Sequence, residues 1–278
     1  MIRAECESMN PRLSSYEGEV GTEDSQGNRK DIDGDYVAQG IIQLKRTKLN
    51  AGGGISVDVK SNNGKAVKRT GLYDGNSGME YLEVIPTEMK DNLPLVVFLP
   101  GDDGWDFIQD YDFMKYIENG GAYKSEECVF LVPHYVPGQE NNTMKLIERV
   151  AQEYNVDPSR IVLTGGSRGA MGAQKIVNDN PNYFAELVLI SGFKVDIDPK
   201  NFASTPVVAY SGTVGDLEAT SAKQMTALIN SINDAGGNAT FISLEGCDHE
   251  SQDKSTPNIL GKDETWESVI YPASRENP

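Results

Sequence analysis

A serine between glycines is the feature of this 278-residue chain that most directly suggests chemistry. The stretch "IVLTGGSRGA" places Gly165, Ser167 and Gly169 at the spacing Gly-x-Ser-x-Gly. An apolar run precedes it and a helical pattern follows, so we expect Ser167 on a sharp strand-to-helix turn that exposes its hydroxyl as a nucleophile. Glycines are needed there if strand and helix approach so closely that side chains at 165 and 169 would collide. The alternative is a tight turn in which Ser167 only caps the helix.

A serine hydroxyl is a weak nucleophile and needs a base, which a carboxylate must hold. The sequence offers two histidines, His134 and His249. For a serine on this kind of turn, the expected order along the chain is serine, acid, histidine. That order excludes His134 as the base and selects His249, which follows the apolar run "ATFISL".

The acid is expected after the run "PVVAYSG", and we predict Asp216 for this role. Glu218 falls in the first turn of the next helix, where a carboxylate suits the helix dipole. Asp196 and Asp198, one strand earlier, are the alternatives. Asp248 is set aside because it would not easily reach the Nδ1 atom of its own neighbour, His249.

Two backbone N–H groups are predicted to bind the oxyanion that forms when a serine attacks a carbonyl. One is that of Arg168, at the start of the helix. The other is assigned to Asp102, in the glycine-containing loop "PGDDGWDF". Trp105 in that loop either contacts a sugar or aryl ring of a substrate or packs its helix on the sheet. His134 and Tyr135 either line the pocket or only cap it.

The elements that must position these residues follow an alternating pattern. Near-continuous apolar runs of strand length alternate with amphipathic helical segments from residue 93 onward, which predicts a mainly parallel sheet covered on both faces. Before them, "ISVDVKSNNGKAVKR" predicts a β-hairpin at Asn63-Gly64, and "MEYLEVIP" a further edge strand. The predicted strands are 93–101, 128–133, 160–166, 186–192, 206–212 and 239–246, and the helices 105–121, 143–156, 167–180 and 217–237.

Composition limits the domain organisation and the partners. Residues 1–35 are polar and acidic and are interpreted as an N-terminal extension, and residues 36–278 as one domain with edge strands over 36–92 and a catalytic core over 93–278. The formal net charge of −17 argues against nucleic acid and anionic membrane surfaces as partners. The absence of an apolar leader at the start favours a cytoplasmic location, the alternative being a trimmed secreted protein.

Several of these segments together carry a family resemblance. "PLVVFLPGDDG", "DPSRIVLTGGSRGAMGAQKIVNDNPNYFAELVLISG", "PVVAYSGTVGD" and "GCDHES" resemble the α/β-hydrolase superfamily, and more narrowly the polyhydroxybutyrate-depolymerase and feruloyl/acetyl-esterase group. Ala170 stands where that group usually has a second glycine. The resemblance covers roughly residues 80–275 and does not include the first 80.

The resemblance implies a three-layer α/β-hydrolase fold and an esterase that acts through an acyl-enzyme, without metal or organic cofactor. Only "FKVDIDPKNFAST" separates two of the strands where many lipases carry a lid, so little or no lid is expected. Asp102 and Asp103 near the site favour a small neutral ester, with a short acyl group or a carbohydrate or aryl link. A thioesterase or peptidase with the same triad, or a binding protein that kept only the fold, are the alternatives; the oligomeric state is left open.

Overall fold

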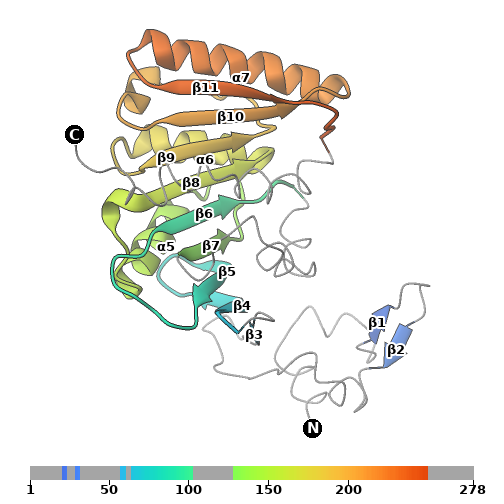
Figure 1. Ribbon diagram of the computed structural model, residues 1–278, viewed down its shortest axis with the longest axis vertical. Helices are drawn as coiled ribbons and strands as arrows, with labels where there is room; N and C mark the ends of the chain where they lie inside the picture. The colour runs from blue at the N-terminus through green and yellow to red at the C-terminus, as the bar shows by residue number, and fades with distance from the viewer. Residues whose placement is uncertain (1–20, 24–28, 32–56, 61–63, 103–127, 250–278) are drawn as a thin grey trace.

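One mixed sheet forms the centre of the molecule in this computed structural model, which describes residues 21–23, 29–31, 57–60, 64–102 and 128–249. Its nine strands lie in the order β11-β10-β9-β8-β6-β7-β5-β4-β3 (Figure 1). The strands from β11 to β7 pair in parallel, while β5, β4 and β3 add an antiparallel edge. The predicted mainly parallel sheet with antiparallel N-terminal edge strands is confirmed. Its strands are β3 (Val57–Lys60), β4 (Ala66–Asp74), β5 (Met79–Pro86), β6 (Leu95–Leu99), β7 (Val129–Pro133), β8 (Ile161–Gly166), β9 (Glu186–Ile190), β10 (Val207–Gly212) and β11 (Ala239–Leu244).

Three helices cover one face of this sheet. In Figure 1 two of them lie behind the strands, and the third runs along the top of the sheet beside β11. They are α5 (Glu140–Glu153), α6 (Arg168–Asp179) and α7 (Asp216–Asp234). Each turns an apolar stripe toward the strands, and together they form one large buried cluster with alternate strand residues. Among the described residues, no helix is long and apolar enough to cross a membrane.

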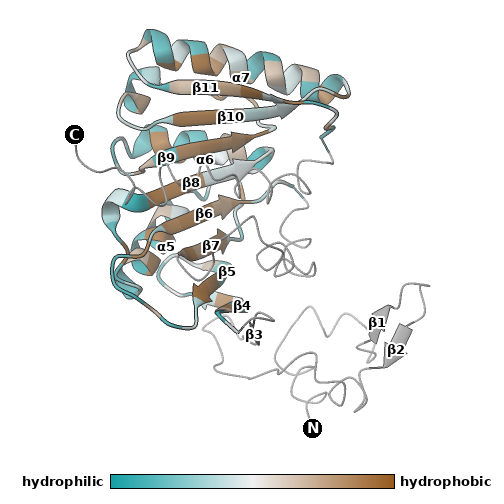
Figure 2. Cartoon of the chain, viewed as in Figure 1, coloured by the Kyte–Doolittle hydropathy of each residue, from teal (hydrophilic) through white to brown (hydrophobic). Residues whose placement is uncertain are grey.

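The opposite face of the sheet carries a second buried apolar cluster. Its members are the intervening strand residues, such as Val96, Phe130 and Val188, each at most 1% exposed. Both faces of the central strands are therefore buried, which explains their unbroken apolar sequence and the concentration of hydrophobic colour on them in Figure 2. The helix predicted over 105–121 lies outside the described residues.

The antiparallel edge begins with the predicted hairpin. β3 pairs with β4, with Lys60 opposite Val67. Gly64, in the connection, has φ +72°, a conformation that suits glycine. Within the region predicted as a polar extension, β1 (Gly21–Glu23) and β2 (Arg29–Asp31) form a short antiparallel ladder, which the composition did not predict.

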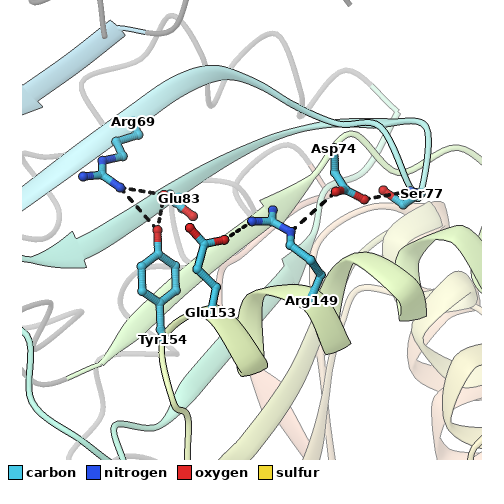
Figure 3. A network of polar contacts seen from close by, with 7 residues as sticks. All are labelled: Arg69, Asp74, Ser77, Glu83, Arg149, Glu153 and Tyr154. Carbon is cyan, nitrogen blue, oxygen red and sulfur yellow. Dashed lines mark hydrogen bonds and ion pairs between the residues drawn. The ribbon is translucent and has the colours of Figure 1, made fainter. Parts of the chain in front are cut away.

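A network of charged and hydroxyl groups joins this edge to α5 (Figure 3). Glu83 of β5 is 2% exposed, and its Oε1 atom accepts hydrogen bonds from the Tyr154 hydroxyl at 2.6 Å and from Arg69 at 3.3 Å. Burial raises the pKa of Glu83, while the hydrogen bond from Tyr154 and the charge of Arg69 lower it. Beside this group, Arg149 of α5 forms an ion pair with Asp74 at 3.6 Å. These contacts connect strands of the edge to a helix of the core.

Removal of the Tyr154 hydroxyl is expected to weaken this connection. In Tyr154→Phe, the buried carboxylate of Glu83 loses its shorter hydrogen bond, which should lower the free energy of unfolding by about 1–3 kcal/mol. Urea denaturation measures the effect. Tyr183→Phe is the matched control, because within the described part of the chain the Tyr183 hydroxyl makes no hydrogen bond and the ring packs on Phe184. Equal stability of the two variants would contradict this role for Tyr154.

Candidate active site

The turn after β8 has the geometry that an exposed serine nucleophile requires. Ser167 has φ +48°, a strained conformation for a residue other than glycine, and α6 begins at the next residue. A Cβ atom on Gly169 would overlap the carbonyl of Leu99, and one on Gly165 would overlap the backbone of Gly169. The predicted collision of side chains at 165 and 169 is therefore confirmed. The Ser167 side chain makes no capping hydrogen bond, so the simple helix-cap alternative does not describe it.

The structure brings His249 to Ser167, as the order along the chain predicted. The two residues are 82 positions apart, and the Ser167 Oγ and His249 Nε2 atoms lie 3.0 Å from each other. They meet because β8 and β11 are parallel members of one sheet, so that the segments following both strands emerge at the same edge. A hydroxyl at this distance can pass its proton to the imidazole.

The carboxylate that contacts His249 is Glu218. Its Oε1 atom lies 2.5 Å from His249 Nδ1, and its side chain is fully buried in the first turn of α7. The Oε2 atom accepts hydrogen bonds from the Ser191 hydroxyl at 2.9 Å and from the backbone N–H of Gly212. Glu218 is thus held on both oxygens and faces the imidazole in a fixed orientation.

The prediction of Asp216 as the partner of His249 is wrong. Asp216 is exposed at the first position of α7, and the alternatives Asp196 and Asp198 are exposed after β9. Residues two apart on a helix point in different directions, so only one of Asp216 and Glu218 can face the sheet. The spacing of the buried residues on α7 indicates which of the two faces the sheet. Apart from the adjacent pair Leu228 and Ile229, the buried positions recur at intervals of three or four and lead back to the glutamate: Ile232, Ile229, Leu228, Met225, Ser221 and Glu218.

The two predicted oxyanion donors belong to residues near Ser167. Arg168 opens α6, and its backbone N–H is one of the donors that a helix start leaves unpaired. Gly101, after β6, lies so close that a Cβ atom on it would be 3.2 Å from the Cβ of Ser167, and Asp102 follows it. Within the described part of the chain, neither the N–H of Arg168 nor that of Asp102 has a hydrogen-bond partner.

The residues predicted to line a substrate pocket are placed differently. Tyr135 is buried, its hydroxyl donates to Glu140 at 2.9 Å, and its ring lies against α6, so the side chain is used in packing. The Nδ1 atom of His134 lies 3.6 Å from a carboxylate oxygen of Glu80. Trp105 lies outside the described residues. An aromatic ring that the sequence analysis did not identify does lie near the site: that of Phe193, after β9, is 6.3 Å from the ring of His249.

Access to the site is not restricted by a long insertion between β9 and β10. That connection contains one short 3₁₀ helix, η2 (Pro199–Phe202), as the sequence predicted. Residues of this connection are held by Gln174, a buried side chain of α6 that donates to the Phe193 carbonyl at 2.8 Å and accepts from the Val195 N–H at 3.2 Å. Among the described residues, no group of three or more His, Cys, Asp or Glu side chains could hold a metal ion.

Comparisons by sequence give no assignment: no family model matches the chain, and no curated protein matches it. Comparison of the fold, in contrast, finds solved structures that are similar to this chain. A thermostable esterase superposes with a TM-score of 0.54 at 16% identity, covering 90% of this chain and 69% of that one. A ferulic acid esterase gives 0.53 at 15% identity, covering 71% and 96%, and a fungal esterase of Rhizomucor miehei gives 0.52 at 12%, covering 85% and 89%. Together with the sheet order and the turn at Ser167, these similarities show that the chain has the α/β-hydrolase fold.

Proposed function

We propose that this protein is a serine hydrolase of carboxylic esters. The observation that carries the proposal is the continuous contact from Ser167 through His249 to the buried Glu218, with distances of 3.0 and 2.5 Å. These three residue types in this order form the triad used for acyl transfer. The esterases among the structures of similar fold support the same reaction class.

Each group has a distinct task in the proposed reaction. His249 Nε2 takes the proton of Ser167 as the serine oxygen attacks the ester carbonyl, and then gives that proton to the departing alcohol. Glu218 accepts from His249 Nδ1, which keeps Nε2 free as the base and stabilises the imidazolium. The backbone N–H groups of Arg168 and Asp102 bind the oxyanion. Water then attacks the acyl-enzyme by the same steps and releases the acid.

The substrate class follows from the surroundings of the triad. We expect a small neutral ester with a short acyl group or an aryl or carbohydrate link, because the connection after β9 is short and the ring of Phe193 lies beside His249. One of the similar structures is a ferulic acid esterase, an enzyme named for an aryl acid. The charge of the Asp102 carboxylate is offset by the guanidinium of Arg168, with which it forms an ion pair.

A fluorophosphonate probe tests the proposal without knowledge of the natural substrate. A structure of similar fold, Thermogutta terrifontis esterase 2 (TM-score 0.51, 15% identity), is described as phosphonylated by sarin. We expect one adduct on wild-type protein, located on Ser167 by peptide mass spectrometry and lost in Ser167→Ala. Absence of the adduct in folded protein that also fails to hydrolyse p-nitrophenyl acetate would favour a binding protein that retains only the fold.

A further inference from the structure

Two candidate oxyanion donors are also joined through their side chains. Arg168 and Asp102 are 66 positions apart, yet the Arg168 Nε atom forms an ion pair with the Asp102 carboxylate. The same guanidinium also donates from Nη2 to the backbone carbonyl of Asp102 at 3.5 Å. The Arg168 side chain thus holds both the carboxylate and the main chain of Asp102, the residue that supplies the other candidate donor.

The position of this pair suggests a role beyond stability. The Arg168 and Asp102 side chains are 38% and 66% exposed, and an ion pair in such a place contributes little to folding because solvent screens it. The pair nevertheless connects the loop after β6 to the first residue of α6, close to Ser167. Within the described residues no other hydrogen bond holds the main chain of Asp102, and the residue before it, Gly101, lies close to Ser167.

We infer that the Asp102–Arg168 ion pair is a positioning device that fixes the spacing between the two oxyanion donors. This inference rests on the proposed function. Donors bind an oxyanion well only if they are held in place before charge develops, and a displacement of about 1 Å at such a site can cost on the order of 10²-fold in rate. The two side chains act only through the position of the backbone N–H donors of Asp102 and Arg168. Substitution of either side chain leaves both N–H groups in the chain and changes only how they are held.

Steady-state hydrolysis of p-nitrophenyl acetate by Arg168→Gln, Asp102→Asn and the double variant tests the inference. We expect each single substitution to lower kcat by about 10-fold, less than loss of a whole donor, with KM within about twofold of the wild type. The double variant should be no slower than the slower single variant, because the two side chains act as one unit. Arg168→Lys, which keeps the charge but not the two-point contact, should recover part of kcat.

Lys175→Gln is the matched control. Lys175 lies on the same helix, is 48% exposed and forms an ion pair with Glu140 at 3.7 Å. The kcat of Lys175→Gln should equal that of the wild type. The melting temperatures of all variants should stay within about 2 °C of one another. Purely structural loss would lower the melting temperature of the Arg168 and Asp102 variants together with their activity, which would overturn the inference.

Two other results would overturn it. Full kcat in both single variants would show that the donors keep their spacing without the pair, while the proposed function stands if Ser167→Ala is inactive in the same assay. A rise in KM at unchanged kcat would instead assign Arg168 to substrate binding. Failure of the wild-type protein to hydrolyse esters or to react with a fluorophosphonate would remove the proposed function, and the inference with it.

Discussion

Glu218→Gln is expected to lower kcat for ester hydrolysis by about 10³–10⁴-fold. The Gly212 N–H and the Ser191 hydroxyl both donate to Oε2, so they should keep an oxygen of the new amide on their side. The NH₂ group of the amide then faces His249 Nδ1, which must act as an acceptor. The proton of the imidazole moves to Nε2, and the base that Ser167 needs is lost. Kinetics with p-nitrophenyl acetate measures this effect.

Asp216→Asn is the matched control for this experiment. Asp216 lies two residues earlier on the same helix but is exposed, and we expect its removal to change kcat by less than about twofold. The two variants together distinguish the acid that the structure places against His249 from the one that the sequence suggested. A large loss in Asp216→Asn with an active Glu218→Gln would reject the assignment of Glu218.

Ser167→Ala is expected to reduce kcat by at least about 10⁴-fold while the protein stays folded. The substitution removes the oxygen that would form the acyl-enzyme and leaves the backbone of the turn unchanged. His249→Ala should cost a comparable factor, because the serine is not activated without its base. The double variant should be no slower than either single variant, since the residues act as a unit.

The control for the serine is Ser231→Ala. Ser231 lies on α7 about 20 Å from Glu218 along the helix axis, and its hydroxyl donates to the carbonyl of Leu228 within that helix. It should retain wild-type kcat. Circular dichroism of each variant separates loss of activity from loss of fold. Appreciable turnover by correctly folded Ser167→Ala would show that hydrolysis proceeds by a route that does not use this serine.

Local sequence patterns were enough to predict most of the framework. Apolar runs predicted β6 to β11, and alternation with Asn63-Gly64 predicted the hairpin of β3 and β4. Gly165 and Gly169 predicted the turn, because a collision between adjacent segments depends on residues close in the sequence. The sequence has only two histidines, and the expected order of serine, acid and histidine along the chain selected His249 over His134.

Local patterns were less informative where the outcome depended on which way a side chain points. Tyr135 is the second residue after the end of β7 and could have lined the site, but the structure uses its hydroxyl and ring for contacts with Glu140 and α6. Phe193 gave no signal, since its place beside His249 depends on two strands that are distant in the sequence.

The sequence by itself selected Ser167 and His249 as the candidate nucleophile and base and predicted the sheet that carries them, because turn chemistry and apolar periodicity are properties of short segments. Only the tertiary structure decided which carboxylate contacts His249 and that Asp102 contacts Arg168. Glu218 faces His249 because the packing of α7 against β10 fixes the rotation of that helix about its axis. The Asp102–Arg168 pair exists because two parallel strands bring distant loops to one edge.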